Sequence, residues 1–154
     1  MTTPTPEIRQ ALYRHLLCTL PIGAVTVSDV AWPNVPFIPD IHRMYLAPFC
    51  LFAETATASL SQTGFERLSG VFQVSVYGIL NTGEADMEEV ARVLVDAYRG
   101  GTVLPLGDWS PVRIQRAYRS SLQVVTGGDQ TSQEVPRPVI IVSADWTQYT
   151  SKGE

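Results

Sequence analysis

The stretch that decides the fold runs from Gly70 to Arg99 and reads GVFQVSVYGILNTGEADMEEVARVLVDAYR. In its first part the apolar residues Phe72, Val74 and Val76 alternate with more polar ones, a period of two that predicts a strand with one buried face. The last part changes to the spacing of an amphipathic helix, whose apolar stripe is formed by Met87, Val90, Ala91, Leu94 and Tyr98. We therefore predict a central strand that leads into a helix packed back on the same sheet.

The ends of this helix also carry sequence signals. Asn81 or Thr82 is expected to cap its first turn, and Glu84, three residues after Asn81, fits a capping box. Gly100 and Gly101 supply the left-handed residue that commonly ends a helix.

The rest of the chain supplies a second helix and further strands. The helix is predicted to start with Thr5 as its hydroxyl cap and Pro6 at its first position, and to be ended by Pro21 and Gly23. The predicted strands are a short one at Val25–Val27, either one long strand or a bent pair within His42–Leu60, and others at Glu66–Tyr77, Val112–Arg119, Leu122–Val125 and Pro138–Trp146, with an apolar loop at Thr102–Trp109. This order predicts one α+β domain over residues 1–154, with an antiparallel or mixed sheet of about four to five strands and two main helices packed against it. Residues 1–4 and 150–154 are expected to be flexible tails.

Composition bounds the kinds of partner that the chain can have. Hydrophobic residues make 45% of the 154 residues and charged residues only 17%, below the usual quarter for a soluble chain. Such a chain often hides part of its surface in an oligomer, although a compact monomer also fits. The net charge of −4 gives no basic field for general nucleic-acid binding.

Cysteine usage and the absence of apolar runs indicate a reducing, soluble compartment. Cys18 and Cys50 have neither a disulfide framework nor the spacing of a zinc or redox motif. Both are predicted to be ordinary buried thiols. The N-terminal residues do not form a signal peptide, and no apolar run reaches the length of about 20 residues that a membrane span needs.

A proline-rich segment precedes the first long strand. Residues 29–39 contain three prolines within seven positions, which predicts an extended, polyproline-like conformation. The segment also holds Trp32, Phe37 and Ile38. These apolar side chains either pack across their own domain or dock on a neighbouring molecule.

The chain offers few groups for catalysis. A nucleophile–histidine pair of Cys18 with His15 can be drawn on one helix face, but a partly buried structural histidine accounts for His15 equally simply. No cluster of histidine, cysteine and acidic residues has metal-ligand spacing, and the motifs of hydrolases, P-loops and dinucleotide folds are missing from the sequence. We therefore predict no catalytic residue, metal or cofactor.

Arginines form the one local charge feature, namely Arg113, Arg116 and Arg119, plus Arg99 and Arg137. On the strand Val112–Arg119, Arg113 and Arg119 are predicted to share an outward face, with Arg116 on the opposite one. The face is either a solvated outer surface or a surface directed at acid on a partner subunit, or at DNA passing nearby.

These segments together resemble the tail terminator-like proteins of long-tailed bacteriophages. The matching features are Trp32-Pro33-Asn34 followed by Pro36-Phe37, then Arg67–Tyr77 with its Gly-Val-Phe-Gln-Val core, then a helix led by Gly83 and containing Ala91, and a closing Pro-Val-Ile-Ile-Val strand. The likeness covers nearly the whole chain in order and spacing, and its motifs are structural rather than catalytic.

The resemblance implies a ring-forming structural subunit of the virion. Such subunits form a ring, usually a hexamer, at the head-proximal end of the tail tube, where they stop tube growth and present a surface to the head. The implied partners are further copies, the tail tube protein and a neck or head-completion protein, with DNA only passing through the lumen and no membrane. Assembly would take place in the host cytoplasm.

The resemblance also directs the choice of interface residues. Trp32, Pro33, Asn34, Phe37 and Ile38 are expected at or beneath the subunit interface, together with Arg113 and Arg119. The polar loop Thr126–Glu134, with Gly127, Gly128 and Asp129, is the candidate contact with the tube or the neck. The alternatives are another head–tail connector, such as a tail completion or head-closure protein, and a small cytoplasmic ligand-binding or enzymatic domain.

Overall fold

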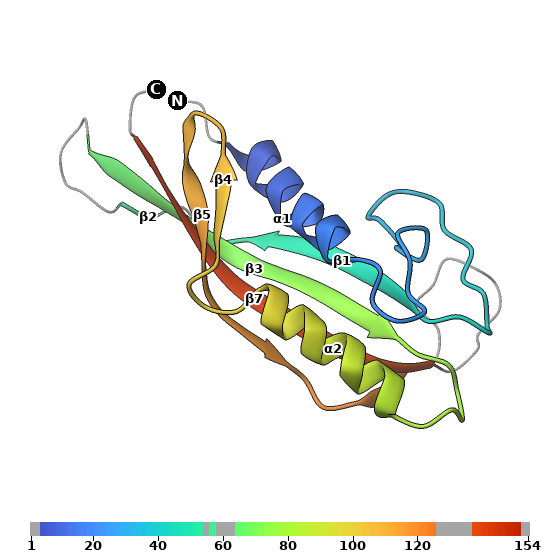
Figure 1. The fold of residues 1–154 in the computed structure, drawn as a ribbon. Coiled ribbons are helices and arrows are strands. Elements are labelled where there is room, and N and C mark those ends of the chain that lie inside the picture. The colour runs from blue at the N-terminus through green and yellow to red at the C-terminus, as the bar shows by residue number, and fades with distance from the viewer. Residues whose placement is uncertain (1–3, 54–55, 58–63, 126–136, 152–154) are drawn as a thin grey trace.

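The fold is built around two long strands, β3 (Phe65–Tyr77) and β7 (Arg137–Ser151), which pair antiparallel along the whole length of β3. The computed structural model describes residues 4–53, 56–57, 64–125 and 137–151 of the chain. The other described elements are α1 (Thr5–Thr19), β1 (Tyr45–Phe52), β2 (Ala56–Thr57), α2 (Ala85–Ala97), β4 (Val103–Leu106), β5 (Trp109–Arg119) and β6 (Gln123–Val125), as labelled in Figure 1.

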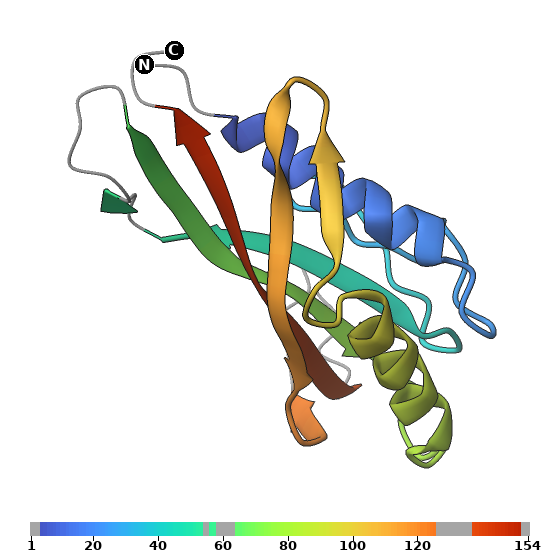
Figure 2. The same ribbon diagram turned by 60° about the vertical axis from the view of Figure 1, so that its left-hand side comes forward.

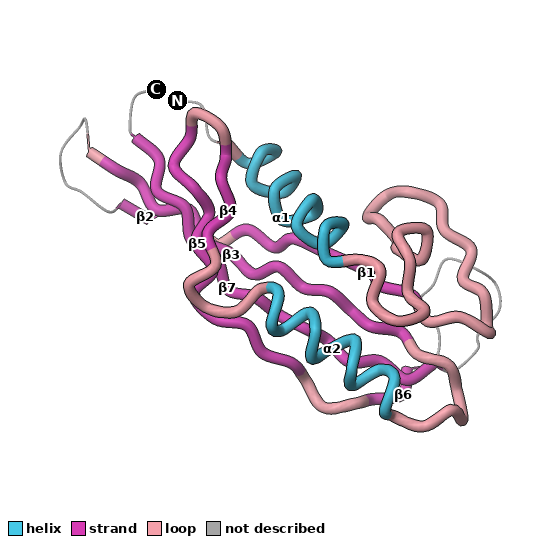
Figure 3. The backbone as a smooth tube through the Cα atoms, viewed as in Figure 1, coloured by secondary structure: helices cyan, strands magenta, loops and turns pink. Residues whose placement is uncertain are grey.

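The strands form one antiparallel sheet with the order β1-β3-β7-β5-β4. Two short strands extend it, because β2 pairs with β3 and β6 pairs with β7 (Figure 3). β3 is therefore an interior strand joined to β1 as a hairpin, as the sequence predicts. The predicted α+β class is confirmed.

The two faces of the sheet differ. On the helix face, residues of β3 and β7 alternate inward and are buried, among them Phe72, Val74, Val142 and Trp146. Both helices cover this face (Figures 1 and 2), and the ring of Phe72 contacts α1 through Tyr13 at 5.9 Å. No helix of the described chain covers the opposite surface, the open face.

The apolar stripes that the sequence predicts for the two helices are confirmed. Ile8, Leu12 and Leu16 of α1 are fully buried, and so is the stripe of α2 formed by Met87, Val90, Ala91 and Leu94. Two hydrogen bonds join the helices, because the Tyr98 hydroxyl donates to the Leu12 carbonyl at 2.7 Å and His15 Nε2 donates to the Ala97 carbonyl at 2.7 Å. His15 therefore has the structural role.

The predicted helix caps are wrong. Glu84 occupies the N-cap of α2 without a side-chain cap bond, because the Thr82 hydroxyl donates instead to the Ile79 carbonyl at 2.8 Å. α1 begins at Thr5, with Pro4 as its N-cap. At the other end, α2 stops at the C-cap Tyr98, before both glycines. Gly101 is left-handed, with φ 95°, but it belongs to the following turn, where its amide donates to the Ile114 carbonyl.

Three further predictions need correction. The apolar loop at Thr102–Trp109 is a hairpin of β4 and β5, since a strand at a sheet edge tolerates Pro105. Only one isolated bridge, Ile22 with Val25, occurs where a short strand was expected. β7 continues through Ser151, because the first residues of β3 offer it partners, so residues 150 and 151 are strand and not tail.

Gly70, in the middle of β3, lies where the structure leaves no space for a side chain. The indole of Trp146, directly across the ladder, occupies the space that a side chain at position 70 would fill. A Cβ placed on Gly70 would lie 2.7 Å from Trp146 and closer still to the carbonyl oxygen of Leu51. Phe52 packs against the same indole edge-on, with ring centroids 5.3 Å apart. Gly70 is therefore required for close packing between β1, β3 and β7.

We predict that Gly70→Ala lowers the free energy of unfolding by about 2–3 kcal/mol, because the added methyl overpacks this contact. Urea unfolding of the purified variant measures the change. Ser69→Ala, one residue earlier in the same strand, is the matched control and should change stability little. Equal stability of the two variants would contradict the packing argument.

Candidate assembly surface

The tryptophan–proline–asparagine motif forms a tight turn. The Val35 amide donates to the Trp32 carbonyl at 3.2 Å, and Asn34 has φ 58°. Proline at the second position and a left-handed residue at the third are the combination that type II turns require. The prediction of an extended, polyproline-like segment is therefore wrong at this motif.

The aromatic residues of the segment pack on their own domain. The ring of Trp32 lies 5.0 Å from that of Tyr13 on α1. Phe37 contacts Tyr45 at 5.1 Å, and Tyr45 in turn stacks on Tyr77 at 4.7 Å. Of the two alternatives left by the sequence, packing within the domain holds for both Trp32 and Phe37.

Ile38 is the exception among the candidate residues. Its side chain is 85% exposed, next to Val35 at 53% and Ile41 at 49%. Three exposed β-branched residues on one connection form an apolar tip, which we call the connection tip. Pro33 is half-buried and Asn34 is exposed beside it.

An ion pair holds the base of this connection. Asp29 accepts hydrogen bonds from Arg43 Nη2 at 2.6 Å and from the Thr26 amide at 2.9 Å. The guanidinium of Arg43, aided by Thr26, lowers the pKa of the Asp29 carboxyl from 3.8 to about 2 against the opposing effect of burial. The neighbouring backbone is fixed as well, because Leu46 exchanges hydrogen bonds with Asp29 and Ala31.

Arg137 attaches the same connection to the end of β7. Its side chain is buried and donates to the carbonyl of Asp40 at 2.6 Å and to that of Arg43 at 3.0 Å. The guanidinium also lies over the ring of Tyr45, 5.0 Å from its centroid. In the sequence, Arg137 stands out only as one arginine of the local charge feature. Its place directly before the apolar closing strand was the sole signal of a structural role.

β1 presents an exposed apolar surface beside the connection. None of its eight residues, YLAPFCLF, is charged. Phe49 is 50% exposed and Leu51 43% exposed on the open face, and Phe52 is 36% exposed on the helix face. Edge strands usually carry charges or other features that discourage pairing with another chain. An uncharged edge of this kind is typical of a strand that is covered by a partner.

The arginines of β5 do not lie as predicted. A bulge between Ile114 and Arg116 shifts the register, so that Arg113 pairs with Thr147 and Arg116 with Asp145, both on the open face. Arg119 lies on the helix face instead. Two of the three charges are neutralised within the chain, Arg116 by Asp145 at 2.5 Å and Arg119 by Glu88 at 3.3 Å. Arg113 is exposed and forms no ion pair with any residue that the structure describes.

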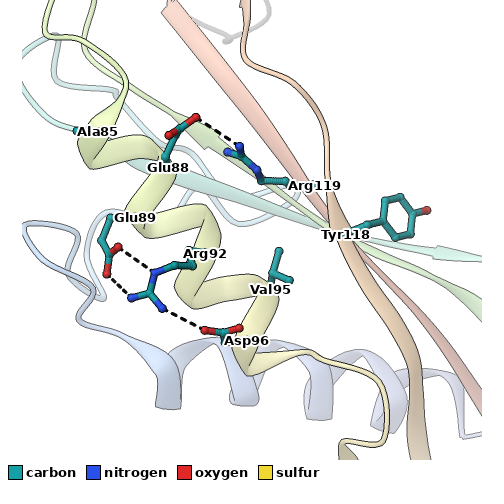
Figure 4. Close-up of a pocket in the computed structure, with 8 residues that line it drawn as sticks. All are labelled: Ala85, Glu88, Glu89, Arg92, Val95, Asp96, Tyr118 and Arg119. Carbon is teal, nitrogen blue, oxygen red and sulfur yellow. Dashed lines mark hydrogen bonds and ion pairs between the residues drawn. The ribbon is translucent and has the colours of Figure 1, made fainter.

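A groove of about 660 Å³ runs between α2 and the end of β5 (Figure 4). Its charged side chains pair with one another, since Arg92 bonds both Glu89, at 2.6 Å, and Asp96, at 3.2 Å, while Arg119 bonds Glu88. The side-chain hydrogen bond of Arg92 lowers the pKa of Glu89. This arrangement is typical of an ion-paired surface rather than of a set of groups converging on a substrate.

The cysteines differ from the prediction in part. Cys18 is exposed and not buried, because it lies on the outer side of α1. Cys50 is half-buried in β1, and burial raises the pKa of its thiol to about 12. The loop residues Gly127, Gly128 and Asp129 lie outside the described residues.

The described residues contain no group of three or more His, Cys, Asp and Glu side chains placed to hold a metal ion. None of the described helices is long and apolar enough to cross a membrane.

Comparison with known families identifies the chain. A family model described as phage tail terminator protein matches residues 7–130. The chain belongs to the phage tail terminator family. Among curated proteins, none matches its sequence. One solved protein structure shares the fold with a TM-score of 0.66, at 22% sequence identity over 96% of each chain. An identity that low shows a common fold alone.

Family membership confirms the resemblance seen in the sequence. The chain is a structural protein of the phage tail, which implies that it resides in the virion and contacts other tail or virion proteins. Among the residues that the structure describes, surfaces open to such contacts in this tail terminator family member include the uncharged β1 edge, the connection tip and the groove beside α2.

We predict that Asp29→Asn lowers the free energy of unfolding by about 1 kcal/mol at pH 7, a value that allows for the solvent around Arg43. Because the pKa of Asp29 is lowered in the folded state, its ionised form stabilises the fold above pH 3.8. That contribution is lost as the pH falls toward about 2. Urea unfolding at several pH values should show the difference shrinking below pH 4. The exposed Asp108→Asn is the control, and a difference independent of pH would contradict the assignment.

We also predict that Arg137→Met destabilises the protein by at least about 2 kcal/mol, because the buried carbonyl of Gly78 and the part-buried carbonyls of Asp40 and Arg43 lose their donor. Limited proteolysis should then cleave within residues 35–44 faster than in the unchanged protein. Arg99→Met, at an exposed arginine, is the control. Unchanged cleavage would show that Arg137 does not anchor the connection.

Proposed function

We propose that this protein is the terminator of the tail tube: copies form a ring, a hexamer, at the head-proximal end of the tube. The ring stops tube polymerisation and provides the surface to which the head or neck attaches. The observation that carries the proposal is the match of residues 7–130 to the tail terminator family. The partners are further copies of the chain, the tail tube protein and a neck or head-completion protein.

The distribution of apolar surface supports self-association. Phe49, Leu51 and Ile38 are exposed near one side of the sheet, and a ring built by rotation uses a different patch on each side of every subunit. Burial of these side chains between copies would remove from water the apolar surface that a low-charge monomer leaves exposed.

The charge of the chain fits a lumen through which DNA passes without being held. Net charge is −4, and two of the three β5 arginines already have carboxylate partners. Arg113 is the remaining candidate for a weak contact with DNA or with an acidic neighbour.

The function is tested on tail tubes. Purified protein added to growing tubes should arrest them at one end, and negative-stain images should show a ring there. Native mass spectrometry of the isolated ring should give six copies. If the protein is found in virions between the tail tube and the head but leaves tube growth unaffected, it is another head–tail connector and not the terminator.

We predict that Ile38→Glu prevents assembly without affecting the fold. The side chain is 85% exposed, so the charge costs the monomer little, whereas burying it between copies is strongly unfavourable. The melting temperature should stay within about 2 °C, while ring formation at tens of micromolar or on tubes is lost. Ile38→Val is the conservative control. Normal assembly of the glutamate variant would remove the connection tip from the interface.

A further inference from the structure

Besides the edge strand β4 and the short strands β2 and β6, two stretches of the sheet, one in β1 and one in β5, have a free outer backbone edge among the described residues. On the outer side of β1, residues 29–31 pair only at Leu46, whose amide donates to Asp29 and whose carbonyl accepts from Ala31. Because outward and inward positions alternate along a strand, Pro48, Cys50 and Phe52 also direct their backbone outward. Pro48 has no amide hydrogen, so the edge carries no donor at that point.

The second free edge belongs to β5. β4 covers the outer side of β5 only as far as Arg113. The last hydrogen bonds on this side are those of Ile114, whose carbonyl accepts from the Gly101 amide and whose amide donates to the Thr102 carbonyl. The Ser120 amide points the other way, to Ile141 of β7. By the same alternation, Ala117 and Arg119 direct their backbone away from the sheet. The groove beside α2 runs along this edge, since both Tyr118 and Arg119 line it.

The two edges lie at the same level of the sheet. One transverse row runs through Phe49, Gln73, Ser143 and Tyr118, and the next through Leu51, Val71, Asp145 and Arg116. Phe49 and Tyr118, at the two ends of the first row, therefore point to the same open face. The free part of β1 is level with the free part of β5.

Strand direction also matches. Every step of the order β1-β3-β7-β5 is antiparallel, so three steps make β1 and β5 antiparallel to each other. A second copy related to the first by rotation about an axis roughly parallel to the strands keeps its strand directions. Its β1 would meet the β5 of the first copy as an ordinary antiparallel neighbour.

The side chains at the two edges do not oppose such a contact. β1 has no charged residue, and the arginines of the free part of β5, Arg116 and Arg119, are already paired with Asp145 and Glu88. The helices are of opposite charge, since α2 carries four acids and one arginine, whereas α1 carries Arg9 and Arg14 against Glu7. α1 of one copy would approach α2 of the next.

We propose that copies of this chain join through main-chain hydrogen bonds, with β1 of one copy paired to the free part of β5 in the next. This inference rests on the proposed ring and adds how its subunits meet. Each copy contributes β1, β3, β7 and β5 to a sheet that continues around the ring, with the open faces on one side. The two edges are different surfaces, so the contact is head-to-tail and closes only by rotation.

Disulfide cross-linking of the ring, isolated or on tail tubes, tests the contact. In a Cys18→Ser background, Phe49→Cys is combined with Tyr118→Cys. Both side chains are exposed on the open face, and the backbone N–H and C=O groups of both residues face their own ladders. Across the new contact they form a non-hydrogen-bonded pair, whose close spacing suits a disulfide. Combining Phe49→Cys or Leu51→Cys with Arg116→Cys or Tyr118→Cys covers a shift of two residues in register.

We expect at least one of the four pairs to give covalent oligomers up to the full ring on a non-reducing gel after mild oxidation. Phe49→Cys with Arg119→Cys is the matched control and should stay largely monomeric, because Arg119 is the next residue on the same edge but lies on the helix face. Rings that are visible by negative stain while none of the four pairs cross-links would overturn the edge-to-edge contact and leave the proposed function intact. Absence of any ring, free or on tubes, would overturn both.

Discussion

The antiparallel ladder between β3 and β7 is the constraint on which the rest of this structure depends. It holds the two longest strands together from Phe65 to Tyr77 and fixes which residues face the helices. Phe72 on that ladder touches both α1, through Tyr13, and α2, through Tyr98. A slip by one residue would exchange the buried and open faces, so the packing of both helices stabilises a single register.

Close contact across this ladder determines how the neighbouring strand is placed. The indole of Trp146 lies over Gly70, and Phe52 of β1 packs on the indole edge. β1 is thereby held at the margin of the sheet with its apolar side chains half in water. The uncharged edge that results is a consequence of core packing, and it is also the surface best suited to a neighbour.

The connection between α1 and β1 combines firm anchoring with an exposed tip. Arg137 and the Asp29–Arg43 pair fix its two ends, and Trp32 and Phe37 pack back on the domain. The connection tip around Ile38, in contrast, stays in solvent. Ordering the tip in advance lowers the entropy lost when a partner binds it, which favours a defined contact over a loose one.

The sequence by itself determined the local elements whose side chains repeat with a clear period. The alternation in β3 and the helical stripe from Met87 to Leu94 predicted the strand–helix unit correctly, because burial of one face produces that period directly. The same patterns, ordered along the chain, were sufficient for the α+β class and for the family. Only the tertiary structure decided the rest. The bulge at Gln115 reversed the predicted faces of Arg116 and Arg119, since one extra residue shifts every later side chain, whereas Arg113 before the bulge keeps its outward face. The burial of Arg137 and the free edges of β1 and β5 depend on residues far apart in the chain, which no local period records.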